Sequence, residues 1–153
     1  MGHGYVFQCK RCRYKLEADL GIGFMTSRET EETVRKMKSG AHGEKAEEFF
    51  RNNPDGTVDC SNVLFQCEKC GALKVDMSLA MYKRKEGTPE PEYHFPDAES
   101  YVKAEEFGHI CGKCGSKMKE LNTAHLIENA FAGKVRCPRC GGKLEIKDVI
   151  CWD

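Results

Sequence analysis

Eight cysteines, arranged in four Cys-x-x-Cys pairs, are the residues of this 153-residue chain best suited to chemistry. A turn with two intervening residues places two thiolates on one side of a metal ion at about 2.3 Å, and a second such turn completes a tetrahedron. Four half-sites therefore make two whole sites. The predicted metal ligands are Cys9, Cys12, Cys67, Cys70, Cys111, Cys114, Cys137 and Cys140.

Internal similarity predicts how these half-sites pair. The segment Val6–Cys12 returns as Leu64–Cys70, and Cys111–Met118 returns as Cys137–Leu144. Because related segments most simply form one unit, we expect the first two Cys-x-x-Cys turns to share one metal and the last two to share the other. Exchanged pairings are the alternative.

The metal expected at each site is zinc, giving two zinc ions per chain. Four sulfurs suit zinc or iron equally, and availability favours zinc. An all-cysteine site leaves no open coordination position, so we expect structural sites, no catalytic residues and no enzyme activity. Redox dithiols are a lesser alternative, since such motifs usually stand alone at a helix start. A zinc switch released by oxidant is another.

The residue after the second cysteine of each turn is expected to adopt positive φ, which glycine tolerates without penalty. Gly71, Gly115 and Gly141 stand at this place in three turns. Arg13 stands there in the first turn, where the left-handed conformation costs roughly 1 to 2 kcal/mol, unless that turn is built differently.

Four such turns between strand-like flanks resemble the zinc ribbon proteins, and Cys137–Gly142 is their most typical form. The chain also resembles small uncharacterised bacterial proteins with a divided zinc ribbon. This resemblance implies a metal site but leaves function open, because zinc ribbons serve in transcription, in ribosomes, in enzyme subunits and as docking modules.

The elements that position these turns indicate a small α+β fold with two ribbon units of short antiparallel strands. We expect residues 1–84 to form a ribbon with a helical insertion at about 26–53, residues 85–107 to be a linker, and residues 108–153 to form a second ribbon. In the insertion, a capping box at Thr26–Glu29 opens a helix to Lys38, and a second helix covers Glu44–Asn52. Phe49 and Phe50 face a core.

Other segments are less regular. Alternating apolar residues predict one half-buried strand over Leu73–Arg84. Pro89, Pro91 and Pro96 favour a surface loop, and Asp97 could cap a short helix to Glu106. A helix over 124–132, capped by Asn122 or Thr123, should bury a face that includes Phe131. Because 108–153 is small, we expect metal chelation to unfold it first.

Composition excludes several classes of protein. The chain has 24 Lys and Arg against 24 Asp and Glu, so no overall affinity for polyanions is expected. No apolar run approaches the length of a membrane span, and the N-terminus lacks a secretory pattern, so a cytoplasmic protein with no membrane partner is expected. No motif indicates a small-molecule substrate.

Function is expected to be a non-catalytic binding module, and zero net charge with an acidic helical insertion favours a protein partner over nucleic acid. An exposed apolar patch at Phe49 and Phe50 would support a protein partner. A continuous basic surface joining the first and last turns would support nucleic acid. Zinc with four thiolates has a charge of minus two, so some cations are expected merely to offset it. The cations around these turns are Lys10, Arg11, Arg13, Lys15, Arg136, Arg139 and Lys143.

Two groups close to this chemistry have simpler explanations. His109 lies two residues before Cys111 and is the one histidine near enough to support or replace a ligand. Cys60 and Cys151 stand alone and are expected to be small packing residues.

Overall fold

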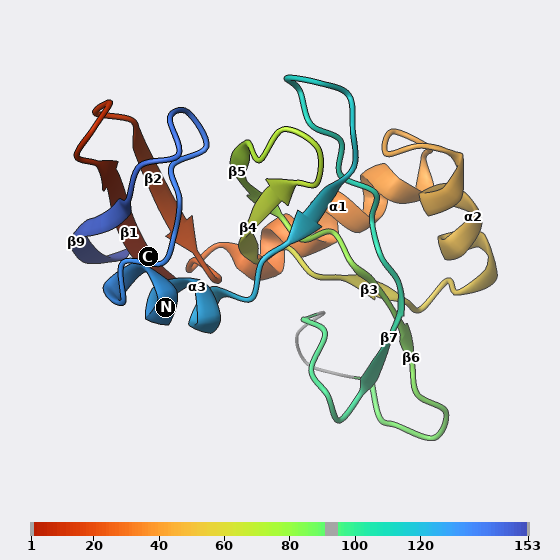
Figure 1. Ribbon diagram of the computed structural model, residues 1–153. Coiled ribbons are helices and arrows are strands. Elements are labelled where there is room, and N and C mark those ends of the chain that lie inside the picture. Colours follow the sequence, from red (N-terminus) through yellow and green to blue (C-terminus); the bar gives the residue numbers. More distant parts are fainter. Residues whose placement is uncertain (1, 91–94, 153) are drawn as a thin grey trace. The chain divides into compact units, whose positions relative to one another are not determined.

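The computed structural model describes residues 2–90 and 95–152 (Figure 1). Its described residues form three helices and nine strands, mostly antiparallel in three small sheets, which confirms the α+β class. The chain divides into two compact units. The knuckle unit, named for its Cys-x-x-Cys turns or knuckles, comprises Met1–Gly23, Asn62–Asp76 and Gly108–Asp153. The helical unit comprises Phe24–Ser61 and Met77–Phe107.

These units interleave along the sequence, whereas the expected boundaries at 84 and 107 were consecutive. The chain leaves the knuckle unit after Gly23 and again after Asp76, and each time it returns to it. The segment expected as a linker, 85–107, belongs to the helical unit. Of the residues expected in that loop, Pro91 lies outside the described ones.

The knuckle unit contains two three-stranded sheets. One has the order β2 (Lys15–Leu20), β1 (Gly2–Cys9), β9 (Leu144–Trp152). The other has the order β5 (Leu73–Met77), β4 (Asn62–Cys67), β8 (Met118–Glu120). The antiparallel pairing of β1 with β9 sets strands from the two ends of the chain side by side, as the red and blue strands of Figure 1 show.

The core of the knuckle unit is built from alternate strand residues and one helix face. Phe7, Leu64 and Leu144 are at most 1% exposed. Helix α3 (Thr123–Phe131) adds buried Leu126 and Ala130, and Asn122 caps it as expected. Phe131 was expected on the buried face but is 70% exposed, because Leu126 and Ala130 define that face instead.

The helical unit packs α1 (Thr26–Lys38) and α2 (Glu44–Asn52) with the sheet β3 (Thr57–Val58), β6 (Met81–Arg84), β7 (Tyr101–Glu105). Both helices match the expected ranges. Phe49 and Phe50 lie in the core with their rings perpendicular and 5.1 Å apart, as predicted for core residues. The expected capping box is absent: Met25 occupies the N-cap position and makes no side-chain cap bond.

Two further expectations were wrong. The segment 73–84 is two strands rather than one, because the chain turns at Leu79, whose φ is 56°. The short helix expected after Asp97 is strand β7 instead. The Asp97 carboxylate accepts the N–H groups of Glu99 and Ser100, so its capping chemistry closes a turn.

Within the described ranges, none of the helices is both long enough and apolar enough to cross a lipid bilayer.

Candidate metal centres

The eight predicted cysteines gather into two groups of four, but not in the pairing that the repeats predict. The outer cluster joins the first and last knuckles, and the inner cluster joins the second and third. Within each group the sulfur atoms all lie within 4.8 Å of one another. The outer cluster is Cys9, Cys12, Cys137 and Cys140; the inner cluster is Cys67, Cys70, Cys111 and Cys114.

Strand pairing explains why the expected pairing is wrong. In the β1–β9 ladder Cys9 lies opposite Leu144, which brings the first knuckle to the fourth. In the β4–β8 ladder Cys67 lies opposite Met118, which brings the second knuckle to the third. Sequence similarity between knuckles therefore reflects a shared local turn, and the sheets decide which turns meet.

The sulfur spacing in both clusters is that of a tetrahedral metal site. Metal–sulfur bonds of about 2.3 Å place the corners of a tetrahedron about 3.8 Å apart. In the outer cluster Cys9 Sγ lies 3.5 Å from Cys140 Sγ, and Cys12 Sγ lies 3.6 Å from Cys137 Sγ. The inner cluster shows 3.4 Å from Cys67 to Cys114 and 3.7 Å from Cys70 to Cys111. All eight cysteines are free thiols, so each cluster is ready to take one ion.

All four knuckles share one backbone design. The residue after the second cysteine donates its N–H to the carbonyl of the first, over 2.8 to 3.1 Å. It has positive φ in every turn, from 58° at Arg13 to 72° at Gly141. The first knuckle is therefore built like the others, and Arg13 accepts the left-handed strain that glycine avoids elsewhere.

Backbone N–H groups also point at the sulfurs. The amides of Cys70 and Arg139 lie 3.4 Å from the sulfurs of Cys67 and Cys137, respectively. The N–H of Gly142 lies 3.4 Å from Cys140 Sγ. Donors of this kind stabilise the thiolate, which is the form that binds metal.

Hydrogen bonds lower the pKa of one thiol in each cluster. The backbone N–H of Cys12 is the main cause that lowers the pKa of Cys9 to about 7. The hydroxyl of Ser116, followed by its N–H, lowers the pKa of Cys114 to about 6. Each cluster therefore has one thiol that ionises readily near neutral pH.

Another thiol in each cluster resists ionisation. Backbone bonds from Tyr14 and Ala72 favour the thiolates of Cys12 and Cys70, but burial and the neighbouring cysteines outweigh them. The pKa rises to about 12 for Cys12 and to about 11 for Cys70. Four thiolates repel one another, and a bound dication is the charge that would let all four ionise together.

The clusters differ in exposure. In the outer cluster Cys9 and Cys137 are buried, while Cys12 and Cys140 are half-buried. The inner cluster includes Cys114, which is exposed. Solvent, chelators and oxidants therefore have more direct access to the inner cluster.

Basic residues form a collar around the outer cluster because the first and last knuckles meet there. Its seven cations, all exposed, are the set expected from the sequence: Lys10, Arg11, Arg13, Lys15, Arg136, Arg139 and Lys143. Arg11 donates to the Cys140 carbonyl at 3.5 Å. Lys10 pairs with Glu145 at 3.0 Å, and Lys15 pairs with Glu17.

Charge is also divided between the units. The knuckle unit contains 14 Lys and Arg against 9 Asp and Glu, which leaves 10 against 15 in the helical unit. Zero net charge for the chain therefore hides a formal +5 on the unit that holds the cysteine clusters and −5 on the other, before any metal or thiolate is counted.

The remaining residues with ligand chemistry lie apart from the sulfur groups or beside them. His109 is buried, with its ring 3.9 Å from that of Phe65 and its Nδ1 3.9 Å from an Asp76 oxygen. It packs next to the inner cluster without joining the group of four. Cys60 is buried in the helical core, and burial raises its pKa, which confirms a packing role. The same expectation is wrong for Cys151, which is exposed on β9.

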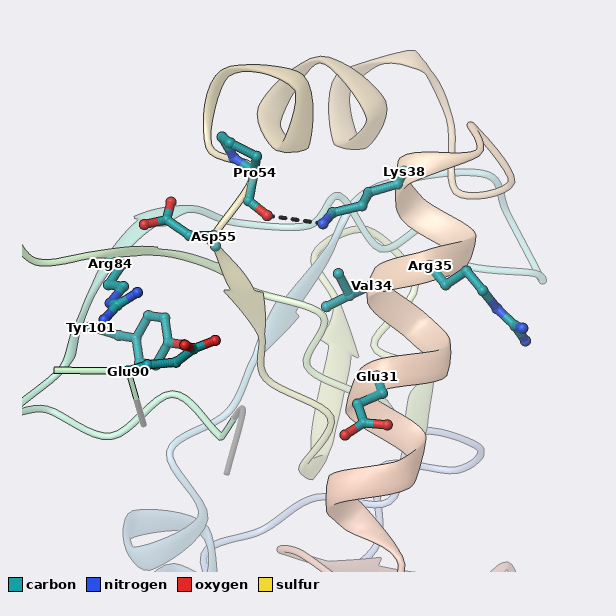
Figure 2. A pocket seen from close by; sticks show the side chains of 10 residues that line it. Glu31, Val34, Arg35, Lys38, Pro54, Asp55, Arg84, Glu90 and Tyr101 are labelled. Carbon is teal, nitrogen blue, oxygen red and sulfur yellow. Dashed lines mark hydrogen bonds between the residues drawn. The ribbon is translucent and has the colours of Figure 1, made fainter. Parts of the chain in front are cut away.

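The helical unit contains a cavity of about 550 Å³ between α1 and the β6–β7 pair (Figure 2). Its cations are already engaged: Lys38 donates to the Pro54 carbonyl at 2.9 Å, and Arg84 to the Thr88 carbonyl at 2.7 Å. Figure 2 shows the Arg35 side chain pointing away from the cavity. Carboxylates such as Glu31 and Glu90 also line it, so the cavity does not favour an anionic ligand.

Comparison with known proteins finds no family model, no curated protein and no solved structure that matches this chain. The chemistry of the two clusters therefore has to be inferred from their own residues.

Proposed function

We propose that the chain is a non-catalytic binding module whose knuckle unit is held together by two structural zinc ions, one in each cluster. The observation that carries this proposal is the pair of four-sulfur groups at tetrahedral spacing. Sulfur fills all four positions, which leaves none for a substrate or a reactive water. Availability favours zinc over iron, because the ligands suit both.

The construction of the knuckle unit supports a folding role for the metal. The unit is assembled from three separate stretches of chain, and the metal would crosslink residues far apart in sequence. The outer cluster joins cysteines 125 and 131 positions apart, and the inner cluster joins cysteines 41 and 47 positions apart. Zinc in structural sites is worth about 10 to 16 kcal/mol of apparent binding free energy, and this is folding free energy.

We propose nucleic acid as the partner, recognised by the basic collar. The apolar patch that would favour a protein partner is not available at Phe49 and Phe50, which are 8% and 2% exposed. The basic surface joining the first and last knuckles does exist. Its seven cations outnumber its paired acids Glu17 and Glu145, together with the minus two of a zinc–thiolate centre, by about three charges.

A protein partner is the second candidate, because β9 lies at the edge of its sheet and exposes Val149 and Ile150, at 48% and 47%. Edge strands offer unpaired backbone groups to another chain. A redox-responsive zinc switch is the third, supported by the exposure of Cys114.

Binding of a labelled single-stranded oligonucleotide to the zinc-loaded chain, followed by fluorescence anisotropy at several salt concentrations, tests the nucleic-acid proposal. The collar variant Arg139→Gln/Lys143→Gln should bind more weakly, and its dependence of log K on log salt should be shallower by about 0.7 for each lost phosphate contact. The matched control is Arg28→Gln/Lys83→Gln, which removes the same charges from exposed positions of the helical unit. Absence of binding, or equal losses in both variants, would contradict the proposal.

A further inference from the structure

The knuckle unit has a groove of about 440 Å³ beside α3 that the metal sites do not use. Its floor is apolar: Leu126 is buried, and Leu73, Leu121 and Val135 are half-buried. Three of these leucines come from different segments, namely β5, the residue after β8, and α3. An apolar floor of this kind favours a flat, weakly solvated ligand.

The rim of the groove is polar and basic. Gln66 and Asn129 each offer an amide that both donates and accepts hydrogen bonds. The exposed ring of His125 supplies a flat surface on which a ligand can stack. Lys134 and Arg136 add two exposed cations at the end of the groove that leads to the fourth knuckle. Arg136 also belongs to the basic collar, so the groove continues from that surface.

Hydrogen bonds fix the rim before any ligand arrives. The Asn122 side chain accepts the His125 N–H at 3.1 Å, which sets the start of α3. The Lys134 N–H donates to the Asn129 carbonyl at 2.8 Å, which sets the end of the helix against the following turn. Preformed groups of this kind lose little entropy when a ligand binds.

Each end of the rim is attached to one metal cluster. Gln66 directly precedes Cys67 of the inner cluster, and Arg136 directly precedes Cys137 of the outer cluster. The two zinc sites would therefore set the distance between the amide of Gln66 and the guanidinium of Arg136.

We infer that this groove holds one unstacked base of a single-stranded nucleic acid, with Lys134 and Arg136 on adjacent phosphates. A base combines flat faces for stacking with an edge that pairs with amide groups, and single-stranded regions alone present both. This inference rests on the proposed function, since it specifies the nucleic acid that the collar binds. A free mononucleotide has the same chemistry, so the test must separate the two sources.

The test compares a labelled oligonucleotide of about 12 nucleotides with one that has the same backbone but abasic positions in place of its bases. The zinc-loaded chain should bind the base-containing strand about 5- to 150-fold more tightly, the range for one stacked base. The variant His125→Ala/Asn129→Ala should lose most of this preference. Phe131→Ala, on the same helix but outside the groove, should keep it. Zinc content and circular dichroism establish that each variant is folded.

Other arms distinguish the failure of this inference from failure of the proposed function. The collar variant Arg139→Gln/Lys143→Gln should weaken both strands while leaving their ratio unchanged. Equal affinity of the unaltered chain for the two strands would overturn the groove inference, although salt-dependent binding would keep the collar proposal. Duplex binding as tight as single-strand binding, or mononucleotides that compete as well as the oligonucleotide, would also overturn it. No binding to any strand would overturn both.

Discussion

Replacement of Cys140 by alanine tests which knuckles share a metal. Cys140 belongs to the outer cluster and is half-buried, so the change removes one ligand while leaving the buried Cys9 and Cys137 in the core. Three sulfurs bind zinc less well than four, and the metal content should fall from two ions per chain to one. The thiols released should be Cys9, Cys12 and Cys137.

The size of the effect follows from what still holds the knuckle unit together. Loss of the outer metal removes crosslinks across 125 and 131 positions. The inner crosslinks span only 41 and 47 positions, so closing them costs about 1 kcal/mol less in chain entropy. The β1–β9 ladder and the core around Phe7 and Leu144 remain. We therefore expect the inner cluster to keep its metal while the unit loosens around the outer one.

The assay is brief alkylation of the zinc-loaded variant under native conditions, with labelled cysteines located by mass spectrometry. New labelling should appear at Cys9, Cys12 and Cys137, and the four inner cysteines should stay protected. The matched control is Cys151→Ala, which removes an exposed thiol outside both clusters and should leave two metals bound. Labelling of Cys111 and Cys114 with Cys9 and Cys12 protected would refute the observed pairing and restore the one that the repeats predict.

Further predictions concern the metal, the lone thiols and the helical unit. A chelator or mild peroxide should release one zinc before the other, and labelling should show that the first to leave is the inner ion, since Cys114 is exposed; simultaneous release would contradict this. In the zinc-loaded chain Cys151 should react rapidly with a thiol reagent and Cys60 only on unfolding, as measured by reagent uptake with and without denaturant. Phe50→Ala, at a position 2% exposed, should destabilise the helical unit by about 3 to 5 kcal/mol in denaturant titrations. Its metal content should stay at two, because the helical unit contains none of the eight ligands.

The structure also changes what chelation is expected to do. The sequence suggested that residues 108–153 would unfold first as a small module. Those residues share their sheets with β1, β2, β4 and β5, and both clusters join them to earlier segments. Loss of metal should therefore loosen the whole knuckle unit, while the helical unit keeps its separate core of residues such as Met37, Phe50 and Met81.

Local features of this protein were determined by the sequence itself. The Cys-x-x-Cys spacing identified all eight cysteines of the two clusters, and the residue after each pair showed where positive φ would occur. Helices at 26–38, 44–52 and 123–131 followed from apolar periodicity and local stop signals. These features depend on contacts within a few residues, and short-range sterics and hydrogen bonds decide them.

Long-range pairing was decided only by the tertiary structure. Nothing local indicates that β1 lies against β9, yet this ladder makes the outer cluster and gathers the basic collar. The same holds for the turn at Leu79, which sends β5 and β6 to different sheets, and for Tyr101–Glu105, which forms a strand because β6 offers it an edge. The four knuckles are nearly interchangeable as local turns, so their similarity cannot choose partners. Strand register and the burial of residues such as Phe7 and Leu144 make that choice, because they are contacts between segments far apart in the chain.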